Sequence, residues 1–229
     1  MKPMLHGLLA SLLLVAATTG ARADTQLDEG FNSGLPAGWI MANFSDNPAG
    51  QAWFQPLTTP DVFSAQNGAA DSYLASNVFV GVTTADGEPT GKIDAMLATP
   101  MVSMAEATVL SFWTRTVSGN SFGDGLRVGA IIAGSFVDLL AINPALTASA
   151  YPEDWTHYTI KLPGQGEGIN GRFYFEYLVP DASKAGNFIG LDSVSVADAL
   201  APVPEPTTGA LLLAGAALLL HLKLRRLAR

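Results

Sequence analysis

The side chains of this chain that could do chemistry are mainly carboxylates. The chain has 229 residues with 20 acidic and 12 basic side chains, no cysteine, and three histidines, of which only His157 lies away from the two ends. Zinc chemistry therefore lacks its usual ligands. Glycoside hydrolysis needs only two carboxylates, so a secreted hydrolase of unrecognised type stays open as an alternative. No compact acidic motif supports it, and we expect no enzyme activity.

One acid lies at a break in an apolar pattern. Within the segment 187–196, Ile189 and Leu191 share one parity, whereas Val194 and Val196 share the other. A strand with a two-residue period can bury all four only if a β-bulge falls near Asp192. Bulges often re-aim side chains at functional sites. Asp192 is therefore either a candidate ligand or simply a residue that ends a strand.

The N-terminal segment follows the pattern of an export signal. Lys2 supplies the positively charged n-region, Leu8–Ala17 is an apolar run, and Ala21-Arg22-Ala23 forms a small-x-small cleavage site. This pattern predicts a signal peptide over residues 1–23, which signal peptidase would remove after Ala23 to leave Asp24 as the mature N-terminus.

The C-terminal segment predicts a membrane anchor. Residues 202–206 read Pro-Val-Pro-Glu-Pro, Gly209–Leu222 is almost wholly Ala, Leu and Gly, and four basic residues follow. A helix over about 207–222 would reach roughly 24 Å at 1.5 Å per residue, slightly less than the hydrocarbon core of about 30 Å. The basic tail should stay cytoplasmic, which would place the residues between the two ends on the far side of the inner membrane.

The residues between these ends suit one acidic domain. The end segments hold six of the 12 bases and one of the 20 acids, which leaves 6 bases and 19 acids, a net charge of −13. Such a charge argues against nucleic acid as a partner. Without cysteine the domain cannot form disulfides, so its stability must come from its core, with metal as an additional contributor.

The domain shows weak helical periodicity and many short β-type runs between Gly, Pro, Asn and Asp, which predicts an all-β antiparallel sandwich over 24–201. In the segment 171–179, one side carries Phe173, Phe175 and Tyr177, and the other, wetter side carries Arg172, Tyr174 and Glu176. The four tryptophans are expected mainly to pack the sandwich. We expect strands at 27–31, 73–82, 96–102, 108–116, 126–133, 136–142, 155–162, 171–179 and 187–196, with loops at 83–90 and 145–154.

The C-terminal arrangement of Pro204-Glu205-Pro206, a short apolar helix and an arginine-rich end resembles the PEP-CTERM sorting signal of Gram-negative bacteria. The resemblance covers about the last 27 residues, counted from Val203. It implies recognition by an exosortase that cuts near the motif. It also implies transient anchoring in the inner membrane, then a final place on the cell surface, the outer membrane or the extracellular matrix.

The domain carries a series of motifs in order along the chain. They are Glu29-x-Phe31-x-x-Gly34-x-Pro36-x-Gly38-Trp39, Trp53, Ser72-Tyr73, Leu97-x-Thr99-Pro100, Leu110-Ser111-Phe112-Trp113-Thr114, Trp155, Gly171-Arg172-Phe173-Tyr174-Phe175 and Ile189-Gly190-Leu191-Asp192-Ser193-Val194. In their order and spacing they are similar to the choice-of-anchor J domain and to the cleaved-adhesin modules of bacterial haemagglutinins and cell-surface proteases. The resemblance covers about residues 27–197 and implies a non-enzymatic jelly-roll sandwich.

The resemblance also implies a calcium site between the first strand, a neighbouring loop and the last strand. Glu29 matches the acid of the opening motif and Asp192 the acid of the closing motif. Asn67 and Asp71, in the loop before Tyr73, could add oxygen ligands of the kind that Ca²⁺ takes. The alternative is that all four are ordinary surface acids and turn formers.

The expected function is therefore that of an exported surface or matrix protein with an adhesive or glycan-binding sandwich and extracellular polysaccharide as a partner. Two alternatives stay open, the secreted hydrolase and a purely structural matrix component.

Overall fold

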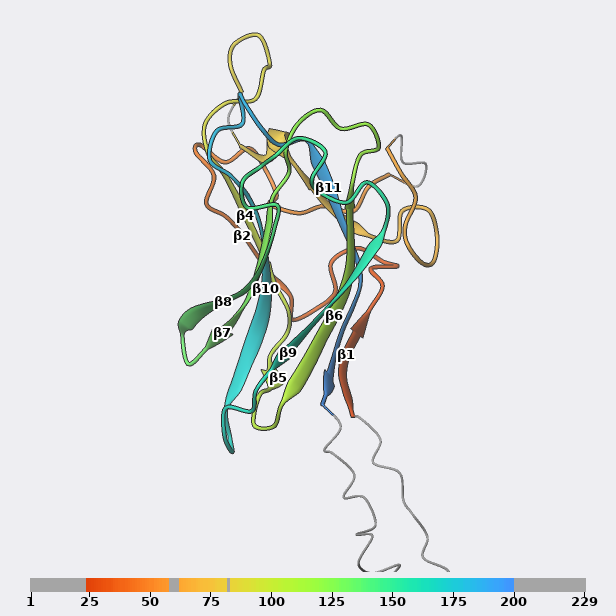
Figure 1. The fold of residues 1–229 in the computed structure, drawn as a ribbon, viewed down its shortest axis with the longest axis vertical. Helices are drawn as coiled ribbons and strands as arrows, with labels where there is room; N and C mark the ends of the chain where they lie inside the picture. The colour runs from red at the N-terminus through yellow and green to blue at the C-terminus, as the bar shows by residue number, and fades with distance from the viewer. Residues whose placement is uncertain (1–23, 58–61, 82, 200–229) are drawn as a thin grey trace, which may run out of the picture. The chain divides into compact units, whose positions relative to one another are not determined.

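Eleven strands form two antiparallel sheets in the part of the chain that the computed structural model describes, residues 24–57, 62–81 and 83–199 (Figure 1). The strands are β1 (Thr25–Glu29), β2 (Ile40–Asn43), β3 (Leu74–Asn77), β4 (Ile93–Ala98), β5 (Val102–Ser103), β6 (Thr108–Thr116), β7 (Leu126–Ile132), β8 (Ser135–Ile142), β9 (Thr156–Leu162), β10 (Asn170–Val179) and β11 (Phe188–Asp198), with a 3-10 turn η1 (Val78–Val80).

The two sheets have a jelly-roll strand order. One sheet has five strands in the order β1-β11-β6-β9, with β3 also paired to β11. The other has six in the order β2-β4-β10-β7-β8, with β5 paired to β10. The order β3-β11-β6-β9 in one sheet and β4-β10-β7-β8 in the other is the jelly-roll pattern of two Greek keys. The predicted all-β antiparallel sandwich is confirmed.

The strand predictions are closest in the second half of the domain. The predicted segments for β6 to β11 all agree with the structure to within two residues. The predicted strand 73–82 is wrong beyond Asn77, because the Asn77 side chain accepts the Phe79 N–H at 2.9 Å and caps the turn η1. The predicted strand 96–102 is also wrong at its end, where β4 stops at Ala98. β2 and β5 were not predicted, since each is too short to show alternation.

The core lies between the sheets. Phe173, Phe175 and Tyr177 of β10 are all 0% exposed, as predicted. The Phe175 ring meets the Phe112 ring of β6 edge-on at 5.1 Å and so links the two sheets. The prediction of a wetter second face for β10 is wrong, because Tyr174 and Glu176 are also buried. Neighbouring strands lie on both sides of β10, and their side chains cover it.

The predicted bulge in β11 is confirmed. The pairing of β11 with β6 shifts register between Asp192 and Ser195, and Ser193 takes a positive φ of 50°. The shift lets Ile189 and Leu191 before it, and Val194 and Val196 after it, all reach the core, where each is 0% exposed.

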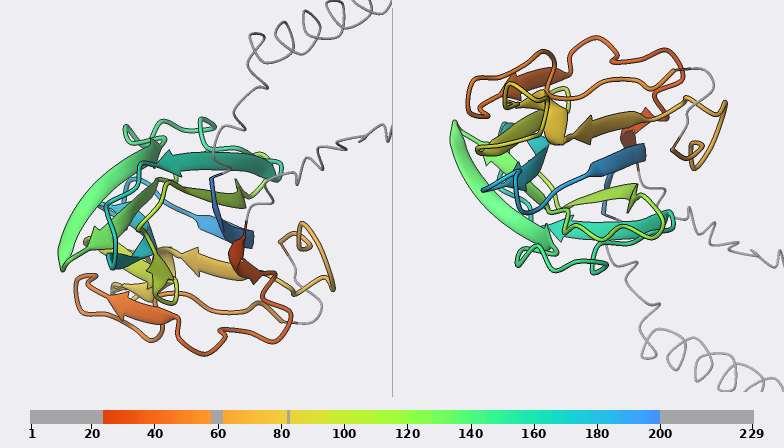
Figure 2. Two further views of the ribbon diagram at one scale, coloured as in Figure 1. Left: turned by 90° about the horizontal axis from the view of Figure 1, so that it is seen from below. Right: turned by 90° about the horizontal axis from the view of Figure 1, so that it is seen from above.

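A second aromatic cluster covers part of the outside of the five-stranded sheet. The long segment between β2 and β3 wraps around this side of the sandwich (Figure 2). It supplies Phe63 and Tyr73, which pack with Trp155 and Phe188, and Arg115 lies 4.5 Å above the Phe63 ring. This part of the outer surface is closed to a large ligand.

The described chain enters and leaves at one end of the sandwich. The Asp198 N–H donates to the Asp24 carbonyl oxygen at 2.9 Å. The loops β6–β7, β8–β9 and β10–β11 gather at the opposite end (Figure 1). No helix within the described ranges is long and apolar enough to cross a membrane. The predicted signal peptide, the sorting motif and the predicted helix over 207–222 all lie outside these ranges.

Candidate functional site

We call the surface of the six-stranded sheet that faces away from the core the outer sheet face. This face carries a row of polar groups. Alternate residues of β10 point toward it, and Tyr174 packs there with Met96 and Ala98 of β4. Glu176 lies opposite Met96 on one side and Arg127 of β7 on the other. The register therefore places charged side chains in the middle of a sheet surface.

Tyr174 lies flat across the neighbouring strand because that strand has a glycine. A Cβ atom on Gly129 would lie 2.5 Å from the Tyr174 ring, so any other residue would displace it. The ring reaches β8, where its hydroxyl donates to the Asp138 carboxylate and its edge meets the Phe136 ring at 5.4 Å. Burial and the bond to Asp138 raise the pKa of Tyr174, so the hydroxyl stays protonated and continues to donate.

A second interaction between strands crosses the outer sheet face two residues further along β10, at Glu176. Arg127 donates to the Glu176 carboxylate through Nε and Nη2, and its Nη1 lies 3.6 Å from Asp138 Oδ2. Burial, and after it a hydrogen bond with the Asp94 carboxyl, raise the pKa of Glu176 to about 7, while Arg127 acts in the opposite direction. The guanidinium is thus held in place by two carboxylates.

The outer sheet face is close to neutral, unlike the rest of the domain. Three of the domain's six basic residues, Lys92, Arg127 and Arg172, lie on or beside it. The Lys92 ammonium lies 2.8 Å from Asp94 Oδ2, whereas Asp94 Oδ1 is buried. The Asp94 carboxyl also contacts the Glu176 carboxyl, so its charge is shared between these neighbours.

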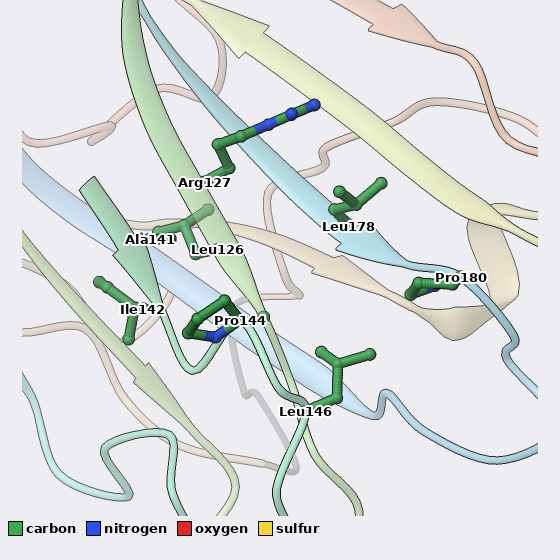
Figure 3. Close-up of a pocket in the computed structure, with 9 residues that line it drawn as sticks. Leu126, Arg127, Ala141, Ile142, Pro144, Leu146, Leu178 and Pro180 are labelled. Carbon is green, nitrogen blue, oxygen red and sulfur yellow. The ribbon is translucent and has the colours of Figure 1, made fainter. Parts of the chain in front are cut away.

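An apolar hollow of about 240 Å³ adjoins this row at the loop end of the face. Figure 3 shows Leu178 and Pro180 on one side of it and Pro144 and Leu146 on the other. Arg127 contributes to its wall and extends over β10 (Figure 3). The hollow therefore joins an apolar wall to a fixed guanidinium, a combination that is common in binding sites.

Two exposed phenylalanines flank the row. Phe136, on the edge strand β8, is 61% exposed, and Phe44 is 56% exposed. The Phe44 N–H donates to the Asp94 carbonyl oxygen at 2.8 Å, so Phe44 continues the pairing of β2 with β4. Ala42 packs on the outer sheet face, and alternation then puts Phe44 on the same face.

Solved adhesin and glycan-binding domains share this fold. The K3 cleaved adhesin domain of Lys-gingipain from Porphyromonas gingivalis W83 matches with a TM-score of 0.54 and 23% identity, over 76% of this chain and 99% of that chain. TmCBM61, solved in complex with β-1,4-galactotriose, matches with a TM-score of 0.50 and 13% identity, over 77% of this chain and 99% of that chain.

An enzyme shares the fold as well. A cyclase from Fischerella sp. TAU matches with a TM-score of 0.52 and 14% identity, over 80% of this chain and 100% of that chain. No protein-family model matches the sequence, and neither does any curated protein. At identities this low the structural matches establish the β-sandwich fold and leave the function to be argued from the site.

The predicted calcium ligands are brought together only in part. Asp192 is 0% exposed, and its Oδ2 accepts the N–H groups of Gln66 and Asn67 at 2.8 and 3.1 Å. Burial raises the pKa of Asp192, and these backbone hydrogen bonds act against that rise. Asp192 and the loop that holds Asn67 therefore do meet at the bulge.

The other two predicted ligands make different contacts. Glu29 Oε1 accepts the Phe31 N–H at 2.7 Å, and the Asp71 carbonyl oxygen accepts from the Gln55 side chain at 3.0 Å. Among the described residues, no three acidic or histidine side chains converge as metal ligands. A calcium site here would need carbonyl and amide oxygens as well, which Ca²⁺ accepts, and the site stays a prediction.

Calcium should raise the thermal midpoint of the protein if this site exists. Bound metal stabilises a fold by about 2.7 kcal/mol when its free concentration is 100 times the dissociation constant. Melts in calcium and in chelator measure this difference, with Asp192→Asn and Glu29→Gln as the variants. Equal thermal midpoints in the two buffers would show that the protein binds no stabilising calcium. A calcium-dependent rise of the midpoint that persists in both variants would show that calcium binds at another site.

Three of the four tryptophans pack within the domain, as expected. Trp39 and Trp53 are buried, and the Trp155 indole N–H donates to the Ser64 carbonyl oxygen at 2.8 Å within the second aromatic cluster. Trp113 is only partly buried, because it lies on the outside of the five-stranded sheet, where its ring is 5.0 Å from the ring of His157. His157 is exposed.

Two arrangements of hydrolytic enzymes can be compared with residues of this domain. Residues 119–123 read Gly-Asn-Ser-Phe-Gly, but they lie in the loop between β6 and β7 rather than at the strand-to-helix turn that the G-x-S-x-G nucleophile needs. Ser121 makes no hydrogen bond to a histidine within the described ranges. The carboxyls of Asp94 and Glu176 are in direct contact, whereas the two carboxyls of a glycosidase stand about 5 Å or more apart.

Proposed function

We propose that this protein is an exported, non-catalytic surface or matrix protein that binds polysaccharide on the outer sheet face. The observation that carries the proposal is the pair of exposed rings, Phe44 and Phe136, on either side of a nearly neutral row of carboxylates and a fixed guanidinium. Sugar rings present apolar C–H faces that pack on aromatic rings. Their hydroxyls donate to carboxylates and accept from guanidinium groups.

The charge of the outer sheet face favours a neutral polysaccharide. Arg127 is paired with Glu176 and Asp138, and Lys92 with Asp94. An acidic sugar would have to displace one of these internal carboxylates from its base, and a basic sugar would have to displace a base. A neutral sugar can bond to both without breaking a pair. The galactotriose bound in TmCBM61, a domain of the same fold, is a neutral sugar of this kind.

The proposal includes the route by which the protein reaches its place. Residues 1–23 act as a signal peptide, and residues 202–229 act as a sorting signal for an exosortase, with Pro204-Glu205-Pro206 as its motif and a transient helix in the inner membrane. Mass spectrometry of the native protein tests both ends. If the mature surface protein retained its C-terminal arginine, cleavage by an exosortase would be contradicted. The C-terminal segment would then be a single-pass membrane anchor.

Phe136→Ala should weaken the binding of neutral oligosaccharides by about 3- to 10-fold, because it removes a platform for stacking. A neutral glycan array identifies the ligand, and titration calorimetry of wild type, Phe136→Ala and Phe44→Ala measures the loss. Leu57→Ala is the matched control, since Leu57 is 80% exposed and lies between β2 and β3, outside the strands of the outer sheet face. Equal affinities in all four proteins would refute the site, and no binding at all would favour a purely structural role.

A further inference from the structure

A second cavity lies at the loop end of the sandwich, opposite the end where the described chain begins and finishes. It has a volume of about 470 Å³, within the range of about 300–1,000 Å³ that is common for small-ligand pockets. Three separate loops build it. The connection from β3 to β4 contributes Phe79, within η1, and Glu88, and the loop between β6 and β7 contributes Phe122. Ser183 and Asn187, between β10 and β11, complete its wall.

A buried carboxylate holds two of these loops together. Asp124 is 0% exposed, and it accepts hydrogen bonds from the Asn187 N–H at 2.7 Å and the Asn120 side chain at 2.7 Å. Asn120 Oδ1 in turn accepts the Phe122 N–H at 3.0 Å and the Asn187 side chain at 3.1 Å. The β6–β7 and β10–β11 parts of the wall are therefore fixed before any ligand arrives, so a ligand would not have to order them.

Two aromatic rings in this wall face solvent. Phe79 is 54% exposed and Phe122 is 48% exposed. Large apolar groups gathered in one exposed concave site commonly mark a place of interaction. The remaining polar groups of the wall can bond to hydroxyls.

The charge of the cavity differs from that of the outer sheet face. The Glu88 side chain has no basic partner among the described residues, whereas nearby Asp181 is paired with Lys184 at 2.7 Å. The surrounding domain carries a net charge of −13. An exposed carboxylate beside aromatic rings in a negative field suits a cation, which the ring faces and the carboxylate both attract.

We propose that this cavity binds a saccharide that carries a free ammonium group, an amino sugar whose nitrogen is not acylated. The C–H face of the sugar packs on Phe79 and Phe122, and the ammonium group lies against Glu88. This inference rests on the proposed glycan-binding function and adds a second site with a different ligand charge. The two sites would let one molecule link neutral and cationic polysaccharide chains.

The test compares glucosamine oligomers with N-acetylglucosamine oligomers of equal length, titrated into the protein at mildly acidic pH, where the free amines are charged. We expect the free-amine oligomer to bind more tightly, and increasingly so at low salt. Glu88→Gln should weaken its binding by about 2- to 5-fold, and Phe122→Ala by about 5- to 10-fold. Glu106→Gln, which alters an exposed acid away from the cavity, should leave it unchanged.

Equal binding of the two oligomers, or unchanged binding in both Glu88→Gln and Phe122→Ala, would overturn the proposal. Thermal melts of each variant show whether it is folded, and Phe79→Ala provides a second aromatic variant if Phe122→Ala is not. Phe136→Ala separates the two sites. It should weaken binding of neutral oligosaccharides and leave binding of the free-amine oligomer unchanged. Either proposed site can therefore be refuted independently of the other.

Discussion

Phe175→Ala is expected to lower the free energy of unfolding by about 3–5 kcal/mol, the usual cost of removing a buried aromatic side chain. Phe175 is 0% exposed and lies on β10 between Leu97 of β4 and Val128 of β7. Its ring also contacts Phe112 of the opposite sheet at 5.1 Å. The truncation would leave a cavity where four strands from two sheets meet, and their backbones cannot close it.

Denaturant unfolding of wild type and Phe175→Ala measures this loss, at an unchanged slope if the transition stays two-state. Phe44→Ala is the matched control, because the same side chain is removed from a position that is 56% exposed. We expect the control to change the free energy of unfolding by no more than about 0.5 kcal/mol. Equal stabilities for Phe175→Ala and wild type would mean that β10 does not face the core in this register.

Asp124→Ala is expected to destabilise the fold by about 3–5 kcal/mol, because it leaves several buried donors without an acceptor. Asp124 accepts from Thr116, Asn120, Tyr177 and the Asn187 N–H. Burial raises the pKa of Asp124, and these four hydrogen bonds act against that rise. The four hydrogen bonds therefore offset the cost of burying the carboxylate, and they also link the loops at this end of the sandwich.

Two further variants test this reasoning by the same unfolding measurement. Tyr177→Phe removes one of the four donors and should cost about 1–2 kcal/mol. Asp28→Ala, at an exposed position of β1, should stay within about 0.5 kcal/mol of wild type. If Asp124→Ala were as mild as Asp28→Ala, the network would be dispensable, and the loops around the second cavity would need another support.

The fold was largely predictable because its signals are local. Alternation along β6 and β10 identifies the core-facing side chains, and the change of parity within β11 required the bulge at Asp192 that the structure has. Alternation gives two faces to a strand and does not say what covers each of them. For that reason Tyr174 and Glu176 were assigned to a wetter face, although neighbouring strands bury both.

The candidate site was much less predictable, since it depends on which strands become neighbours. The sequence assigned the tryptophans mainly to packing and identified no exposed ring, whereas the described residues include four exposed phenylalanines, Phe44, Phe79, Phe122 and Phe136. A weak signal existed for Phe136, which lies in a segment without clear alternation, as is typical of an edge strand. Nothing local indicates that Gly129 makes room for Tyr174, or that Arg127 meets Glu176 across two strands.

The strand periodicity, the bulge and the export and sorting patterns at the two ends can be recognised from the sequence, because each depends on residues that are close together in the chain, and the acidic charge follows from composition alone. The surfaces that are available to a ligand depend instead on the tertiary structure. Pairing β10 with β4 and β7 gathers bases onto one face of an acidic domain. Asp124 joins the β6–β7 loop to the β10–β11 loop, and these two loops and the β3–β4 connection line the second cavity. Both depend on contacts between residues far apart in the chain, whose partners are set by sheet order and burial rather than by local pattern.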